Sequence, residues 1–321
     1  MTTSQPLIVA LAQIAPVWLD RAATVEKIAH WVSQAAAEGS RLVAFGEALA
    51  PGYPFWVEHT DGARFDSPLQ KALFAHYASQ AIDISRGDLA PVCSAARKGR
   101  LWVAMGCIER VHGRGHSLYC SLVLIDDIGE VRNVHRKLMP THEERLVWSP
   151  GDGQGLRCFA IDDFTVGGLN CWENWMPLAR SALYAQGEDL HLALWPGNAR
   201  NTVDLTRHIA RESRSYVLSV SGLMCREDIP ARLPHADLLR EALSDVCADG
   251  GSCIAAPTGD WIIAPCIGEE RLLVATLDPA VVRAERQNFD PFGHYSRPDV
   301  LELQVNRTRP AGAQFSDDPL A

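Results

Sequence analysis

Short apolar runs alternate along the chain with longer segments in which apolar residues recur every three or four positions. Residues 6–14 and 41–45 are apolar, strand-like runs, and residues 20–39 between them show helical spacing that ends at a glycine. Further strands are expected at residues 101–109, 118–126, 130–138, 156–161, 164–170, 190–195, 216–223, 252–264 and 272–277. Further helices are expected at residues 68–82, 89–98, 175–187, 202–215 and 237–247.

The order of these elements predicts an α/β fold of layered sheets. Strands joined by helices alternate with hairpins, such as the one expected across the tight turn at residues 126–129. No repeat, low-complexity tract or linker divides the chain, so one domain is favoured over the two that 321 residues would allow. The last stretch, 289–321, is polar and rich in proline and is expected on the surface or against a partner subunit.

Composition and charge narrow the function classes. The chain is 47% hydrophobic and 21% charged, which is typical of a soluble globular protein. Its formal charge is 30 − 39 = −9, and Lys and Arg are not clustered, so a nucleic acid or an anionic membrane is not expected as a partner. The same charge pattern predicts a small substrate that is not polyanionic. The N-terminus lacks the basic and apolar regions of a secretory signal, which predicts a cytoplasmic protein.

The chain contains nine cysteines, and one of them occupies a distinctive position. None shows CxxC spacing, and several, including Cys107, Cys120 and Cys253, lie within apolar runs, as reduced packing cysteines do. Cys171 instead stands where a predicted strand meets a predicted helix. The positive end of the helix would lower the pKa of its thiol and hold an oxyanion, which suits a nucleophile. The alternative is that Cys171 is another packing residue.

Three charged residues near other strand ends are candidate partners for such a nucleophile. Glu47 follows a predicted strand and precedes a Gly/Pro loop, where a half-buried carboxylate would have a raised pKa and act as a general base. Lys137 lies at another strand end, and Glu144 follows it by seven residues. Each of the three would be an ordinary surface charge if taken alone.

Four blocks in order along the chain resemble the nitrilase branch of the carbon–nitrogen hydrolase superfamily. They are FGEALAPGYP (45–54), HRKLMPTHEERLVW (135–148), GGLNCWEN (167–174) and FDPFGHYSRPD (289–299). The resemblance implies a single-domain, four-layer αββα sandwich at residues 1–299, a surface or oligomer-contact tail at 300–321, and assembly into a homodimer or higher homo-oligomer. Gly46, where the family often has proline, and Ser149-Pro150 are departures that affect pocket shape rather than chemistry.

The same resemblance implies a role for each of four residues. Cys171 would be the nucleophile, Glu47 the general base, Lys137 the cation near the tetrahedral centre, and Glu144 the residue that orients Lys137 and the substrate. The Cys-Trp-Glu sequence favours true nitrilases over amidases and carbamoylases. The implied reaction is hydrolysis of an organic nitrile to a carboxylic acid and ammonia through a thioimidate and a thioester. The chemistry requires no cofactor or metal, and the sequence contains no clustered His/Cys ligand pattern.

Aromatic residues close to these blocks predict an apolar pocket for an aromatic or arylaliphatic nitrile. The candidates are Tyr53, Phe55, Trp56, Trp148, Trp172 and Trp195. For Trp195, core packing is an equal alternative. Asn198 is expected near the site, whereas His191 and His208 are expected to be structural.

Other functions remain open at this point. A cyanide-hydrolysing enzyme or an aliphatic amidase of the same superfamily would retain the same four residues. Release of an amide instead of an acid is a further variant of the nitrile reaction. A catalytically silent binding protein is the alternative outside enzymes, and the intact set of four residues argues against it.

Overall fold

The computed structural model describes residues 5–112 and 115–310, and strands make up most of its interior. The strands are β1 (Leu7–Gln13), β2 (Leu42–Phe45), β3 (Trp102–Arg110), β4 (Leu118–Ile125), β5 (Val131–Arg136), β6 (Phe159–Ile161), β7 (Phe164–Asn170), β8 (Leu190–Trp195), β9 (Tyr216–Ser221), β10 (Leu223–Cys225), β11 (Val246–Ala255), β12 (Trp261–Ile267) and β13 (Arg271–Leu277). The helices are α1 (Arg21–Ala37), α2 (Trp56–His59), α3 (Pro68–Gln80), α4 (Ala90–Gly99), α5 (Pro177–Tyr184), α6 (Ala199–Ser213), α7 (Ala236–Ala242) and α8 (Pro279–Glu285).

The strands form two mixed sheets that stack on each other. The first has the order β13-β1-β2-β3-β4-β5, and the second has the order β10-β11-β9-β8-β7-β6, with β12 paired to β11. In each sheet the central strands are parallel (β1, β2 and β3 in the first; β7, β8 and β9 in the second), and antiparallel strands complete both edges. This arrangement combines the helical crossovers and the hairpins that the sequence predicts.

Strand alternation divides the apolar residues between two kinds of core. In β1, Leu7, Val9 and Leu11 lie in the core between the sheets, whereas Ala10 and Ala12 lie in the core beneath the helices. Side chains of a strand point alternately to its two faces, so a strand buried on both sides reads as a continuous apolar run. This is why the sequence shows apolar runs and not an apolar–polar alternation.

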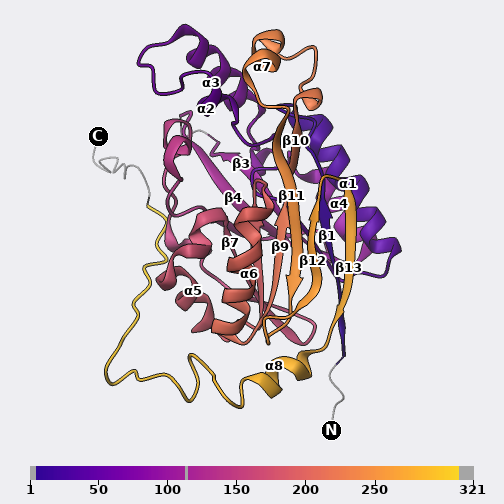
Figure 1. Ribbon diagram of the computed structural model, residues 1–321, viewed down its shortest axis with the longest axis vertical. Helices are drawn as coiled ribbons and strands as arrows, with labels where there is room; N and C mark the ends of the chain where they lie inside the picture. Colours follow the sequence, from indigo (N-terminus) through magenta and orange to yellow (C-terminus); the bar gives the residue numbers. More distant parts are fainter. Residues whose placement is uncertain (1–4, 113–114, 311–321) are drawn as a thin grey trace, which may run out of the picture.

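Helices cover the outer face of each sheet (Figure 1). α1 and α4 pack on the first sheet through residues such as Ile28, Val32 and Val92. α6 packs on the second sheet through Leu205 and Ile209, and α5 packs beside it. The predicted four-layer αββα sandwich is confirmed.

Several element boundaries differ from the prediction. The single strand expected at 252–264 is two strands, β11 and β12, because a turn closed by the Ala256 N–H···O=C Asp260 hydrogen bond reverses the chain. The helix expected at 237–247 ends at Ala242, and residues from Val246 onward belong to β11. Gly222 divides the strand expected at 216–223 into β9 and β10. None of the helices within 5–112 and 115–310 is long and apolar enough to cross a bilayer.

The described part of the C-terminal tail lies against its own chain. Figure 1 shows this segment, in yellow, passing below α5 after α8 and then running along one side of the molecule. Leu303 and Val305 are partly buried beside an apolar cluster that includes Leu156, and Arg309 Nε donates to Asp152 Oδ2 at 2.8 Å. The predicted boundary at residue 299 and the predicted contact with a second subunit remain predictions, and residues 311–321 lie outside the described part.

A close contact between two glycines sets the path of the chain after β2. Gly106 in β3 donates its N–H to Gly46 O at 3.1 Å. A Cβ on Gly106 would lie 2.4 Å from Gly46 O and 2.5 Å from Glu47 Cα, and both are backbone atoms. Only glycine at position 106 lets the segment that carries Glu47 lie directly on β3.

We therefore expect Gly106→Ala to lower the free energy of unfolding by about 3 kcal/mol, the upper end for overpacking in a core. Gly268→Ala is the matched control, because Gly268 has a positive φ of 79° and no neighbouring atom within 4 Å of an added Cβ. Its cost is limited to backbone strain of about 1 kcal/mol. Urea denaturation of both variants measures the difference, and equal losses would show that the contact is unimportant.

Candidate active site

Three of the four residues predicted to carry the chemistry follow the ends of strands in the two sheets, and the fourth lies in a short helix. Glu47 follows β2 and Lys137 follows β5 of the first sheet, whereas Cys171 follows β7 of the second. Glu144 lies in a short 3₁₀ helix, η2 (His142–Leu146). All four side chains are buried.

These side chains form one contact cluster around the ammonium group of Lys137. Its Nζ lies 2.9 Å from Glu47 Oε1 and 2.7 Å from Glu144 Oε2. The thiol sulfur of Cys171 and a carboxylate oxygen of each glutamate lie within 4.8 Å of one another. The structure thus brings together all four predicted residues.

Neighbouring donors hold the Glu144 carboxylate in place. The backbone N–H of Thr141 donates to Oε2 at 2.6 Å, and the Tyr53 hydroxyl donates to Oε1 at 3.0 Å. Because both oxygens have partners in addition to Lys137, this carboxylate has one fixed orientation. Its fixed position determines where the Lys137 ammonium lies.

The burial of the cluster shifts the proton affinities of its members. Burial raises the pKa of Glu47 to about 7, although the charge of Lys137 opposes the rise. Burial alone would lower the pKa of Lys137, but Cys171 in its thiolate form and the carboxylates of Glu47 and Glu144 raise it well above its ordinary value. Lys137 therefore stays protonated, and Glu47 exchanges its proton near neutral pH, as the sequence predicts for a base between charged neighbours.

The environment of Cys171 corrects one prediction. Cys171 begins a 3₁₀ helix, η4 (Cys171–Trp175), with a positive φ of 47°, so it does stand at a strand-to-helix junction. The pKa of its thiol is nevertheless raised well above the usual value, first by burial and then by the negative charge of Glu47, while the Trp172 N–H only partly opposes the rise. The expected lowering of the pKa by a helix N-terminus is wrong, because burial, and then the charge of Glu47, outweigh the lowering by Lys137 and the Trp172 N–H. The resting group is a thiol, which requires a base.

A second buried carboxylate ties the Cys171 turn to the strand end that carries Lys137. Glu173 accepts the N–H of Asn170 at 2.8 Å and the N–H of Leu138 at 2.7 Å, and His135 Nε2 lies 3.1 Å from both of its oxygens. Burial alone would raise the pKa of Glu173, but His135 and these donors lower it. Glu173 therefore joins β5 of one sheet to the turn after β7 of the other.

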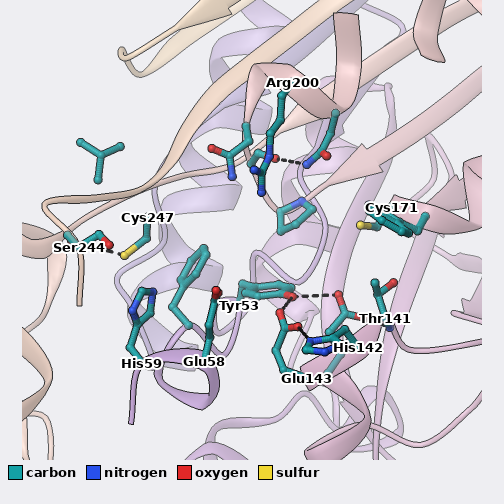
Figure 2. A pocket seen from close by; sticks show the side chains of 18 residues that line it. Tyr53, Glu58, His59, Thr141, His142, Glu143, Cys171, Arg200, Ser244 and Cys247 are labelled. Atoms are coloured by element: carbon teal, nitrogen blue, oxygen red, sulfur yellow. Dashed lines mark hydrogen bonds and ion pairs between the residues drawn. The ribbon is translucent and has the colours of Figure 1, made fainter. Parts of the chain in front are cut away.

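A cavity of about 860 Å³ opens beside Cys171. Figure 2 shows Cys171 on one side of it, Tyr53 near the middle, and His59, Ser244 and Cys247 on the opposite side. Its lining combines apolar with polar and charged side chains, namely Tyr53, Phe55, Trp172, Pro196 and Val246 with Glu58, His59, His142, Glu143, Asn198, Arg200, Asn201 and Ser244. The cavity is accordingly more polar than the apolar pocket predicted from the aromatic residues.

The predicted pocket aromatics divide into two groups. Tyr53 and Trp172 line the cavity, and Phe55 does so as well. Trp56, Trp148 and Trp195 lie behind its wall in the hydrophobic cores, where Trp148 stacks edge-on against Tyr53 with ring centroids 5.5 Å apart. The large apolar side chains of these three residues pack in the core, which is the alternative role of aromatic residues.

Three other predicted positions have clear surroundings. Asn198 lines the cavity, as expected. His191 is buried between Glu188 Oε1, at 2.9 Å, and Asn174 Oδ1, at 2.7 Å, which is a structural role. His208 is exposed on α6 near Glu212.

The sequence did not indicate several residues that line the cavity. His59, Arg200, Ser244 and Cys247 come from segments far apart in the chain, and no motif marks them. Glu173 was part of the Cys-Trp-Glu motif and so carried a signal, but its spacing from His135 did not reveal the pair. Cys120, whose thiol lies 3.4 Å from Glu47 Oε1, appeared only as a packing residue.

The described residues contain one trio of possible metal ligands close together, namely Glu47, Glu144 and Cys171. The Lys137 ammonium, however, lies within ion-pair distance of both carboxylates, where a cation would have to lie. Two like charges at that distance repel strongly when buried. The donor set therefore holds the Lys137 ammonium and does not fit a metal ion in addition to it.

The chain is similar to known proteins in sequence and in fold. Residues 8–287 match the family model described as carbon–nitrogen hydrolase. A nitrilase of Pseudomonas syringae pv. syringae (strain B728a) is 38% identical, covering 99% of this chain and 95% of its own. Nitrilase 2 of an unknown prokaryotic organism is 36% identical, covering 96% and 95%. The crystal structure of a carbon–nitrogen hydrolase from Helicobacter pylori G27 has the same fold, with a TM-score of 0.69, 19% identity and coverage of 92% and 96%.

Glu173→Gln tests the link between the two sheets. The amide can no longer accept hydrogen bonds at both oxygens, so we expect the free energy of unfolding at pH 7 to fall by about 3–5 kcal/mol, as when a buried ion pair is broken. The lowered pKa of Glu173 contributes stability above its ordinary value near 4.5, and this contribution is lost as the pH falls through the folded-state pKa. Urea denaturation should therefore show a variant whose deficit shrinks in acid.

Glu26→Gln makes the same chemical change at an exposed position of α1 and serves as the control. It should leave both the stability and its pH dependence unchanged. A Glu173→Gln protein as stable as the control at pH 7 would contradict the assigned role.

Proposed function

Because the chain belongs to the carbon–nitrogen hydrolase family and is a nitrilase that acts on nitriles, we propose that it does so through a covalent intermediate on Cys171. The observation that carries this proposal is the position of the Lys137 ammonium, 2.9 Å from Glu47 and 2.7 Å from Glu144, beside the buried thiol. This arrangement supplies a nucleophile, a base and a fixed positive charge in one buried cluster.

In the first half of the reaction, Glu47 takes the thiol proton while the sulfur of Cys171 attacks the nitrile carbon. One C–N π bond breaks, and the nitrogen receives its electron pair and then the proton from Glu47, which gives a thioimidate. The raised pKa of Glu47, about 7, suits both taking and returning this proton. Lys137 uses two of its three N–H groups on the glutamates and has a third for the charge that develops on the substrate.

In the second half, Glu47 takes a proton from water as the water oxygen attacks the thioimidate carbon. Glu47 passes this proton to the nitrogen and then relays the proton of the newly added hydroxyl group as well. The C–N bond breaks as the carbonyl forms, the nitrogen leaves as ammonia, and a thioester remains. A second water releases the carboxylic acid and restores the thiol. Lys137 and the backbone N–H of Trp172 stabilise the tetrahedral states, and each such donor is typically worth about 2.7–4 kcal/mol.

Aromatic or arylaliphatic nitriles are the proposed substrates. Tyr53, Phe55, Trp172 and Pro196 offer an apolar wall, and Tyr53 lies between Cys171 and the far side of the cavity. Of the six aromatics predicted for the pocket, Tyr53, Phe55 and Trp172 are assigned direct contact, while Trp56, Trp148 and Trp195 support the wall from behind. His59 and Ser244 on the far side favour a substrate long enough to reach them.

Two related reactions would use the same groups. If the tetrahedral state loses the thiolate instead of ammonia, the product is an amide. Cyanide or an aliphatic amide would also meet the same nucleophile and base. The size of the cavity, about 860 Å³, favours an organic nitrile over the much smaller cyanide. We further propose a homodimeric or higher assembly in the cytoplasm, which light scattering and localisation would test.

Lys137→Ala should abolish turnover, a loss of more than about 1000-fold, because the charge that stabilises the tetrahedral states is removed. Lys137→Met keeps the length of the side chain without the charge, so comparing it with Lys137→Ala separates an effect on chemistry from an effect on folding. Both variants leave Glu47 and Glu144 buried without their cation. Lys98→Ala, an exposed lysine of α4, is the control and should retain full activity. Wild-type rates in a folded Lys137 variant would refute the assignment.

A substrate panel tests the proposed reaction itself. Arylacetonitriles, benzonitrile, aliphatic nitriles, cyanide and primary amides should be assayed for ammonia, acid and amide. We expect arylaliphatic nitriles to react fastest and to yield acid and ammonia in equal amounts, with Cys171→Ala inactive. Faster turnover of amides or of cyanide would favour one of the related reactions instead.

A further inference from the structure

A second buried thiol contacts the carboxylate of Glu47. Cys120 lies in β4, is 1% exposed, and its Sγ is 3.4 Å from Glu47 Oε1. The backbone of the same residue accepts the Lys137 N–H at 2.8 Å. Cys120 therefore contacts both the base and the residue that carries the cation, although the reaction described above assigns it no role.

The two oxygens of Glu47 have different surroundings. Oε1 receives two donors, the ammonium of Lys137 and the thiol of Cys120. Oε2 is buried and has no hydrogen-bond partner among the described residues. Because Oε1 is already engaged by two donors, Oε2 is the oxygen with a free lone pair for an incoming proton.

We propose that Cys120 is a positioning residue for Glu47: its S–H group holds Oε1 and directs Oε2 to the proton that is transferred. This inference rests on the proposed function, in which Glu47 is the general base. The thiol is suited to the task because it stays protonated. Its pKa is raised well above the usual value by burial and then by the charge of Glu47.

A thiol also differs from other donors in strength. An S–H group is a weak donor, so it orients the carboxylate and stabilises its charged form only slightly. The other groups that face Glu47 are Lys137 after β5, Glu144 in η2 and Cys171 in η4; Lys137 favours the charged form, and Glu144 opposes it. Since burial and Glu144 oppose the charged form of Glu47 while Lys137 favours it, a change in the one remaining donor should move the proton affinity of Glu47 measurably.

The test compares Cys120→Ala, which removes the donor, with Cys120→Ser, which replaces it by a stronger one. On the acidic side of the pH profile of kcat/KM, the limb where the rate falls reports the proton affinity of the base in the free enzyme. We expect the limb to move to higher pH by about half to one pH unit in the alanine variant, and to stay or move to lower pH in the serine variant. Cys107→Ala is the matched control, because Cys107 is a fully buried thiol in β3 whose neighbouring charge is Glu109 and not Glu47.

A second readout does not depend on turnover. The rate at which iodoacetamide alkylates Cys171, followed by mass spectrometry of its peptide, should show the same shifts with pH, since Glu47 accepts the thiol proton. If the wild type hydrolyses no nitrile but the alkylation profiles shift as expected, the proposed function fails and the role of Cys120 stands. If both profiles are the same in Cys120→Ala and Cys107→Ala, or if the serine variant shifts in the same direction as the alanine variant, the role of Cys120 is overturned.

Discussion

The contact on which the site depends is the ammonium of Lys137 held between two buried carboxylates. With a neutral thiol and both carboxylates ionised, the buried cluster carries one excess negative charge. Burying such charges costs the fold free energy unless further hydrogen bonds hold them. Thr141 and Tyr53 supply these bonds to Glu144, and Cys120 supplies one to Glu47. The apolar cores must offset the remainder, which is a common compromise at active sites.

In the proposed reaction, the excess negative charge determines how Cys171 is activated as the nucleophile. A thiolate at Cys171 would place a second uncompensated negative charge beside Glu47 and Glu144, so the thiol retains its proton at rest. The pKa of Glu47 is also raised. Glu47 can therefore accept that proton only as the sulfur bonds to the substrate and the negative charge of the sulfur moves onto the substrate. Such coupling would spare the free thiol from oxidation or alkylation when no substrate is bound, because the thiolate is the reactive form.

Sequence reasoning located the reacting groups but not their electrostatic balance. Cys171, Glu47 and Lys137 follow strands, and strand ends could be found from apolar runs that stop at polar residues. The raised pKa of Cys171 depends first on burial and then on Glu47, which lies more than a hundred residues away in the chain, so the local expectation of a helix N-terminus pointed in the wrong direction. Cavity residues such as His59, Arg200 and Ser244 lie on unconnected segments and have no periodicity that could identify them. The turn between β11 and β12 was visible in its Pro-Thr-Gly-Asp sequence but was overridden by the apolar run around it.

The separation of the two sheets sets the position of the proposed base relative to the proposed nucleophile. Glu47 belongs to the first sheet and Cys171 to the second, and the side chains between them, such as Leu42 and Leu192, set the separation of the two layers. One main-chain bond crosses the gap directly, from Glu47 N to Trp195 O at 3.0 Å, so Trp195 contributes through its carbonyl while its ring packs in the core. Interiors are close-packed, and a change of one methylene between the sheets would move the two groups relative to each other. Because catalysis is sensitive to misplacement on the order of 1 Å, the packing of this sandwich is part of the catalytic apparatus.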